Sequence, residues 1–342
     1  MTSLLTASTV TGDRSKPLLE LTVDAVLRRA VAADPAALAL ASPQQGVRLS
    51  YAETDLKVEH LARGFVAAGL QPGDRIGIWA PNCAEWYLTM FAAARAGLIL
   101  VNVNPAYRTA ELEFALRHVG ARALVYSANL KNSNYVQMLR SLIPELDAAV
   151  AGKLTCACFP ELRLLIQIGG TPTPGTIAFP EVIADGARRD GAPLAKIAAA
   201  LDPHQPYNIQ FTSGTTGLPK GATLTHHNIV NNGFFVGEAM RLTPDDRLCI
   251  PVPMYHCFGM VLGVLAAVTH GAASIYSGEG FEPTAVLETV ARERCTVLHG
   301  VPTMFIAELE HPRFREFDLS TLRTGIMAGS PLPDRGDAPR HR

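Results

Sequence analysis

The sequence predicts an α/β protein with mostly parallel sheets and flanking helices. Short apolar runs of strand character alternate with longer segments whose apolar residues recur at helical spacing. Strands and helices that alternate at these lengths form right-handed βαβ crossovers, which make the sheets parallel. The 342 residues are enough for two or more cores, and 48% hydrophobic with 18% charged residues is a globular balance.

The first half of the chain contains the opening repeats of this pattern. Strands are expected at residues 75–79, 98–103, 123–126 and 162–168, and helices at 21–32, 50–69, 82–97 and from 109 onward. Ser50 and Glu53 have the spacing of a capping box, and Asn82 is expected to cap the following helix. The core-facing side of the helix at 50–69 is expected to carry Leu56, Leu61, Phe65 and Val66.

The second half continues in the same way. Strands are expected at residues 207–211, 246–252, 272–276, 295–299 and 322–328, and helices from about 225, at 258–268, from 283 and at 300–310. Proline at 283 is tolerated because it falls in a first helical turn. Residues 169–180, rich in glycine, proline and threonine, predict an exposed loop, and residues 184–201 are expected to be partly helical.

Residues 212–221 spell T-S-G-T-T-G-L-P-K-G between a predicted strand and a predicted helix. Glycines let backbone amides turn toward a ligand, hydroxyls donate hydrogen bonds, and a lysine adds a mobile positive charge. This combination predicts a loop that binds the phosphates of a nucleotide. The residues expected to contact the nucleotide here are Thr212, Ser213, Gly214, Thr215, Thr216, Gly217 and Lys220.

Two other interpretations of this loop are weaker. The Walker loop requires glycine where Pro219 stands and a magnesium-binding hydroxyl where Gly221 stands. A surface turn without a ligand has no need for glycines, hydroxyls and a lysine at the positions that a phosphate loop uses.

The segment 206–231 resembles the signature of the AMP-forming synthetases, the superfamily of acyl-CoA synthetases, firefly luciferase and peptide-synthetase adenylation domains. Similar stretches reach from about residue 20 to about residue 331, so residues 20–331 are expected to form the large N-terminal domain of that fold. The resemblance implies a two-step reaction. A carboxylate attacks the α-phosphate of ATP, and a thiol, usually that of coenzyme A, then displaces AMP; Mg²⁺ is the implied metal cofactor.

The resemblance also implies roles for single residues. Residues 212–220 would hold the β- and γ-phosphates, with Lys220 as a catalytic residue. His256, in P-M-Y-H-C-F-G, matches a position near the carboxylate, and a core histidine at a strand–helix junction is the alternative. Gly329 and Ser330 resemble part of the wall around the adenine and acyl groups. Residues 253–259 and 325–331 are most similar to fatty-acyl-CoA synthetases, which favours a medium-chain acid.

Family members continue past the position of Ser330 with a Tyr-Gly-x-Thr-Glu motif, a ribose-binding aspartate, a hinge and a C-terminal domain with a catalytic lysine. None of these is found here, and residues 332–342, rich in proline and charge, are expected to be a disordered tail such as a frameshift or gene-model error would produce. A C-terminally truncated synthetase, weakly active or inactive alone, is therefore expected, because losing one preorganised donor typically lowers a rate by about 10²–10³.

Two alternatives stay open. One is an aryl-acid ligase or adenylation domain of the same superfamily. The other is a non-catalytic nucleotide-binding fragment, or half of a split enzyme that a separately encoded C-terminal half completes.

Charge and cysteine usage argue against other classes. A net charge of −1 without a Lys/Arg run argues against a nucleic-acid partner. Among six scattered cysteines only Cys156 and Cys158 are close, at no common zinc spacing, which predicts reduced thiols in a cytoplasmic protein without metal ligands.

Residues 1–19 are expected to be a flexible lead-in, and no apolar stretch reaches the about 20 residues of a membrane span. His226 and His227 are expected to be helix-capping or surface residues.

Overall fold

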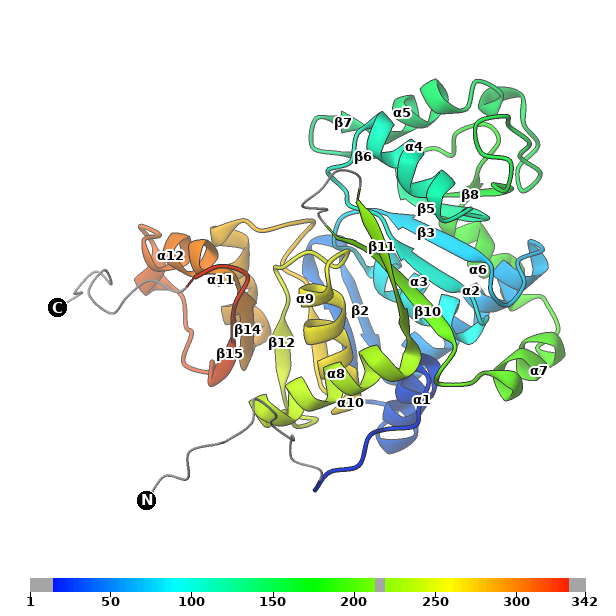
Figure 1. Cartoon of the computed structure of the whole chain (residues 1–342). Helices are drawn as coiled ribbons and strands as arrows, with labels where there is room; N and C mark the ends of the chain where they lie inside the picture. Colours follow the sequence, from blue (N-terminus) through cyan, green and yellow to red (C-terminus); the bar gives the residue numbers. More distant parts are fainter. Residues whose placement is uncertain (1–14, 213–218, 332–342) are drawn as a thin grey trace, which may run out of the picture.

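The computed structural model describes residues 15–212 and 219–331, and Figure 1 shows the arrangement of their elements. The larger sheet has seven strands in the order β11-β10-β4-β3-β5-β8-β9. All neighbours in it are parallel except β11, which runs antiparallel to β10. The strands are β3 (Arg75–Trp79), β4 (Ile99–Asn102), β5 (Ala123–Ser127), β8 (Leu164–Ile168), β9 (Ile177–Ala178), β10 (Pro206–Thr212) and β11 (Lys220–Thr225).

The smaller sheet has six strands in the order β15-β14-β12-β13-β1-β2. Only β2 is antiparallel to its neighbour, β1. The strands are β1 (Leu38–Ser42), β2 (Val47–Ser50), β12 (Arg247–Cys249), β13 (Ala273–Ile275), β14 (Val297–Gly300) and β15 (Thr324–Met327). A separate short hairpin joins β6 (Asn129–Leu130) to β7 (Ser133–Asn134). The prediction of an α/β fold with mostly parallel sheets is confirmed.

Helices connect the strands in both halves. In the first half they are α1 (Val23–Ala33), α2 (Tyr51–Ala67), α3 (Ala84–Arg95), α4 (Thr109–His118), α5 (Tyr135–Leu142), α6 (Phe179–Ala187) and α7 (Ala192–Ala200). In the second half they are α8 (His226–Met240), α9 (Cys257–Gly259), η3 (Met260–Leu265), α10 (Ala266–Thr269), α11 (Pro283–Glu293) and α12 (Pro302–Leu309). The short 3₁₀ turns are η1 (Pro43–Gln45), η2 (Leu146–Ala148) and η4 (Phe314–Glu316).

Three helices lie between the two sheets and create a shared core. Helix α3 contacts β3 and β4 on one side and β1 on the other, while α8 contacts β10 and β11, and α10, packed on α8, contacts β13. The resulting apolar cluster includes Ile78 of β3, Leu248 of β12, and Trp86 and Phe91 of α3. Each large apolar side chain buried there contributes about 1.5–3 kcal/mol. The core therefore fixes the two sheets relative to each other.

Helix α2 confirms one local prediction and corrects another. Its capping box is present, because the Glu53 amide donates to Ser50 Oγ at 3.2 Å and the Ser50 amide donates to Glu53 Oε2 at 2.8 Å. Leu56, predicted to face the core, is 54% exposed. The buried face follows the 3.6-residue period through Tyr51, Thr54, Val58, Leu61 and Phe65, which leaves position 56 on the opposite side.

Other local predictions need correction. The N-cap of α3 is Cys83 rather than Asn82, whose side chain has other partners described below. Residues 169–180 are not wholly an exposed loop, because Thr173 and Thr176 are buried and β9 begins at Ile177. The helix predicted at 258–268 is present, but its middle, η3, has the wider winding of a π-helix, a form often found at functional sites.

All six cysteines are free thiols. Within the described ranges, no helix combines the length and the apolar character that crossing a lipid bilayer would require.

Candidate active site

The predicted phosphate loop joins the two strands of a hairpin, β10 and β11 (Figure 1). Thr212 ends β10 and Lys220 begins β11, and these two exposed residues are register partners, with Thr212 Oγ1 3.5 Å from the carbonyl oxygen of Lys220. Of the predicted nucleotide contacts, Ser213, Gly214, Thr215, Thr216 and Gly217 lie outside the described residues. The expected order of strand, loop and helix is incomplete, because β11 stands between the loop and α8.

The turn at residues 251–256, which follows β12, carries His256. His256 is the N-cap of α9: its Nδ1 accepts a hydrogen bond from the Phe258 amide at 3.1 Å, and the Cys257 Sγ lies 3.6 Å away. The side chain is at the surface, so the alternative of a core histidine is wrong. Partial burial of the ring lowers the His256 pKa, which favours the neutral imidazole.

Buried amide side chains connect the hairpin to this turn. In β10, Gln210 donates to Asn208 Oδ1 at 2.8 Å, and Asn208 donates to Asn102 Oδ1 at 2.8 Å. Asn102, at the end of β4, donates to the Tyr255 carbonyl oxygen at 3.0 Å. Asn102 and Asn208 are buried, where an unpaired polar group costs about 1–3 kcal/mol. The amide chain therefore holds the hairpin and the His256 turn in a fixed relation.

Asn82 holds the same turn from another side. Its Nδ2 donates to the Val252 carbonyl oxygen at 2.9 Å, and its Oδ1 accepts a hydrogen bond from the Met254 amide at 2.8 Å. Gly259, the last residue of α9, is required by close approach to the turn: a Cβ there would lie 2.4 Å from the Pro253 carbonyl oxygen. The strand-end asparagines and this glycine together determine where His256 is presented.

Gly329 and Ser330, the predicted wall residues, follow the end of β15. Gly329 has φ +92°, a backbone conformation that favours glycine, and a Cβ there would lie 3.1 Å from a Val301 methyl group. The Ala328 amide donates to the Gly300 carbonyl oxygen at 3.3 Å, which pairs the ends of β14 and β15. In the part of the chain that the structure describes, no hydrogen bond joins Gly329 or Ser330 to Thr212, Lys220 or His256.

The candidate residues stand at or after the carboxyl ends of strands in both sheets. Thr212 is the last residue of β10 in the larger sheet, and His256 and Gly329 follow β12 and β15 of the smaller sheet. Ligands of open α/β sheets bind beyond the carboxyl ends of the strands. The arrangement offers hydroxyl and lysine donors at the hairpin tip and an imidazole on the adjoining turn, which are groups suited to anionic ligands.

The family profile "AMP-binding enzyme" matches residues 27–336. The chain belongs to the AMP-binding enzyme family. Relatives include the mitochondrial medium-chain acyl-CoA ligase ACSF2 of Danio rerio, 43% identical over 331 residues (96% of this chain and 54% of the relative). The ACSF2 protein of Homo sapiens is 42% identical over 331 residues, which are 95% of this chain and 54% of that protein.

A solved structure supports the same fold. The anthranilate CoA ligase AuaEII in complex with anthranoyl-AMP superposes with a TM-score of 0.79 at 22% identity, over 92% of this chain and 56% of that chain. At this identity the likeness concerns the fold alone. The chain spans about half the length of the curated relatives it matches.

In this member of the AMP-binding enzyme family, the sequence singled out the loop segment and His256 as candidates but not the positioning amides Asn82, Asn102 and Asn208. A signal was present for Asn102, because it stands in an otherwise apolar strand and a buried amide needs hydrogen-bond partners. The expectation for His226 was wrong. His226 is buried, stacks on Tyr207 with ring centroids 4.6 Å apart, and accepts a hydrogen bond from the Val23 amide at 3.2 Å.

Proposed function

We propose that this chain is the N-terminal part of an acid–thiol ligase that uses ATP to convert a medium-chain fatty acid to its coenzyme A thioester through an acyl-adenylate. The observation that carries the proposal is the amide chain from Gln210 through Asn208 and Asn102 to Tyr255. It ties a hairpin suited to phosphates to a turn suited to a carboxylate. The family membership and the printed names of the relatives support the reaction class.

The proposed chemistry assigns two anionic groups to separate parts of the site. Residues 212–220 hold the β- and γ-phosphates, and Lys220 neutralises charge on the departing pyrophosphate. His256 orients the attacking carboxylate: because Nδ1 accepts the Phe258 amide, a neutral ring carries its proton on Nε2 and donates from there. Gly329 and Ser330 line the wall near the adenine and acyl groups, where small residues let a ligand approach the backbone.

Mg²⁺ is proposed to arrive with the phosphates of ATP. Magnesium in proteins is commonly held by one or two carboxylates together with substrate phosphates. The side chains of Thr212, Lys220, His256 and Ser330 include no carboxylate, so these residues alone do not form a magnesium site. The ion, when bound, would neutralise phosphate charge, while the hairpin donors fix the direction of the phosphate chain.

The proposed location of the protein is the cytoplasm. Its proposed partners are small molecules, namely a carboxylic acid, ATP and coenzyme A. Because the chain spans about half of its relatives, a C-terminal half would complete the site, either in the same polypeptide or as a separate chain.

The test is ATP–pyrophosphate exchange with straight-chain acids of increasing length and with benzoate. It is run on the 342-residue chain and on a chimera that continues it with the C-terminal part of the Danio rerio ligase. We expect exchange with medium-chain acids in the chimera. Lys220→Ala should lower it about 10–150-fold, the loss of one charged hydrogen bond. Lys196→Ala, at an exposed position on α7, is the matched control and should leave exchange unchanged.

Each contrary outcome has a distinct meaning. Exchange with benzoate but not with fatty acids would replace the substrate class by aryl acids. Equal activity of the two lysine variants would overturn the phosphate role of Lys220. A folded chimera that binds ATP without any exchange would favour the non-catalytic alternative.

A further inference from the structure

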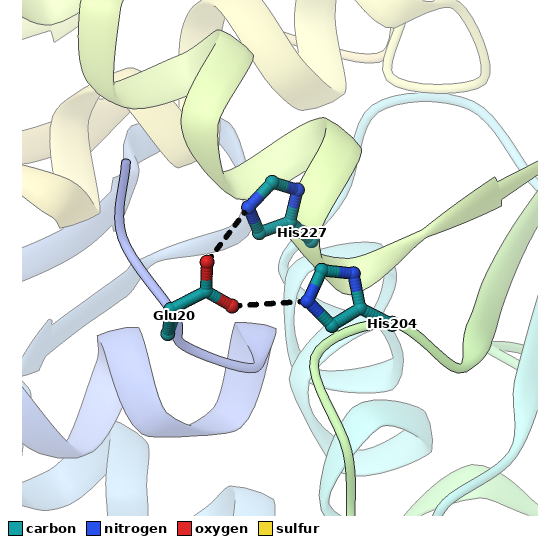
Figure 2. Close-up of side chains that lie close together, drawn as sticks. All are labelled: Glu20, His204 and His227. Atoms are coloured by element: carbon teal, nitrogen blue, oxygen red, sulfur yellow. Dashed lines mark hydrogen bonds and ion pairs between the residues drawn. The ribbon is translucent and has the colours of Figure 1, made fainter. Parts of the chain in front are cut away.

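Three side chains from separate segments meet at the base of the β10–β11 hairpin (Figure 2). Glu20 precedes α1, His204 lies between α7 and β10, and His227 stands in the first turn of α8. One Glu20 oxygen is 3.1 Å from His204 Nε2, and the other is 3.2 Å from His227 Nε2. The hairpin begins and ends here, with Pro206 paired to Thr225, whereas residues 213–218 join its other end. The cluster is therefore separate from the candidate active site.

We propose that Glu20, His204 and His227 bind a divalent transition-metal ion, with Zn²⁺ as the best fit. Two imidazoles and one carboxylate are a ligand set that zinc accepts, with water in the fourth position. Bonds of about 2.0–2.2 Å place tetrahedral zinc ligands about 3.4 Å apart. Each imidazole nitrogen is already close to that spacing from one of the two Glu20 oxygens.

The remaining adjustment is small. One ligand atom from each residue can be chosen so that all three lie within 4.8 Å of one another. Any two of these atoms would then approach by at most about 1.4 Å to reach tetrahedral spacing. The two imidazole rings already stack, with centroids 4.6 Å apart and planes 28° apart. Both Nε2 atoms face the Glu20 carboxylate, as Figure 2 shows.

The backbone around the cluster is fixed before any ion binds. The Leu19 amide donates to Asn231 Oδ1 at 2.7 Å, and Asn231 Nδ2 donates back to the Leu19 carbonyl oxygen at 3.0 Å. On the other side of Glu20, the Val23 amide donates to His226 Nδ1 at 3.2 Å. Glu20 is thereby held on α8, next to His227, although the two are far apart in sequence.

The histidine segments are also joined to each other. The His227 amide donates to the Pro203 carbonyl oxygen at 2.8 Å, and the His204 amide donates to Asp202 Oδ1 at 2.8 Å. These bonds keep the loop that carries His204 against the start of α8. Metal sites bind tightly when surrounding hydrogen bonds orient their ligands in this way.

One of the proposed ligand atoms has no hydrogen-bond partner among the described residues. His227 Nε2 is buried and, among the described residues, makes no hydrogen bond of suitable geometry, although Glu20 is 3.2 Å away. A metal ion would use this nitrogen lone pair. Glu20 and His204 are more exposed, with 64% and 62% of their side-chain surfaces accessible, so an ion and its water can enter from solvent.

A bound ion would link the segment before α1 to the base of the hairpin. An ion that binds the folded chain and not the unfolded chain raises stability by mass action. The role is structural, and it holds whether or not the proposed ligase activity is correct.

The test is a Zn²⁺ titration of the chelator-treated 342-residue chain against a chromophoric chelator, with Co²⁺ absorption as a second probe. We expect one ion per chain and a raised thermal midpoint, with neither effect from Mg²⁺. His204→Gln, His227→Gln and Glu20→Gln should each weaken binding at least about tenfold, because even outer-shell changes typically cost 10–100-fold. His118→Gln, at an exposed position on α4, is the matched control and should bind as the parent does.

The Co²⁺ spectrum identifies the ligands. A site of nitrogen and oxygen donors gives no thiolate charge-transfer band, whereas binding at exposed Cys257 beside His256 would give one. Thermal unfolding without metal checks that each variant is folded, and His204→Gln, on an exposed loop, keeps the test valid if His227→Gln is unstable. Absence of stoichiometric zinc, a thiolate band, or parent-like binding by the three variants would overturn the proposal.

Discussion

Asn208 allows a direct test of how the hairpin is tied to the His256 turn. Its buried side chain donates to the Leu100 carbonyl oxygen at 2.9 Å and to Asn102 Oδ1 at 2.8 Å, and it accepts from Gln210 at 2.8 Å. Leucine has the same number of side-chain heavy atoms and the same branching, but no polar atoms. Asn208→Leu therefore removes the hydrogen bonds while it preserves most of the packing.

The expected loss follows from the partners that remain. Two buried acceptors, on Leu100 and Asn102, lose their donor, and each such group costs about 1–3 kcal/mol. Gln210 is only partly buried and can turn to water. The added apolar surface of leucine returns about 1 kcal/mol. The free energy of unfolding should therefore fall by about 3 kcal/mol.

Urea denaturation measures this loss as a shift of the midpoint at an unchanged slope. Asn232→Leu makes the same substitution at an exposed position on α8 and should change stability by no more than about 0.5 kcal/mol. In the chimera, Asn208→Leu should lower the maximal exchange rate more than it raises the substrate KM values, because the hairpin and the turn lose their alignment. A loss below about 1 kcal/mol, or one equal to that of the control, would refute the reasoning.

Two further predictions concern the core and its pH dependence. Buried Arg95 donates to Asp24 at 2.6 Å and also to Asp55, so Arg95→Met should cost about 3–5 kcal/mol in urea denaturation. Arg117→Met, at an exposed pair, should stay within about 0.5 kcal/mol, and equal losses would count against the buried network. Burial lowers the His226 pKa from 6.5 to about 4. As the pH falls, the unfolded chain therefore binds the proton at a higher pH than the folded chain does. The contribution of neutral His226 to the free energy of unfolding should be fully present above pH 6.5, and about 3 kcal/mol of it should be lost toward pH 4. The urea midpoint should therefore fall less steeply with pH in His226→Gln than in the parent chain. Parallel plots of midpoint against pH for the two chains would contradict this.

Much of the architecture was predictable because it depends on local patterns. The alternation of apolar strands with helical periods gave the α/β class, and the Ser50–Glu53 spacing located the start of α2. The segment that combines glycines, hydroxyls and Lys220 gave the candidate site. Predictions failed where a residue's role depends on a distant neighbour, as for Asn82, which bonds residues 252 and 254 instead of capping α3.

Residues close along the chain thus encode which segments become strands and helices, and they also encode the glycines, hydroxyls and lysine that predict phosphate binding. The packing of distant segments, by contrast, lets Asn208 and Asn102 join the hairpin to the His256 turn, and it brings Glu20 to His204 and His227 across 184 and 207 positions. Such contacts depend on how sheets and helices pack. No local spacing encodes them, because the hydrophobic core brings the segments together and the polar groups then find partners within reach.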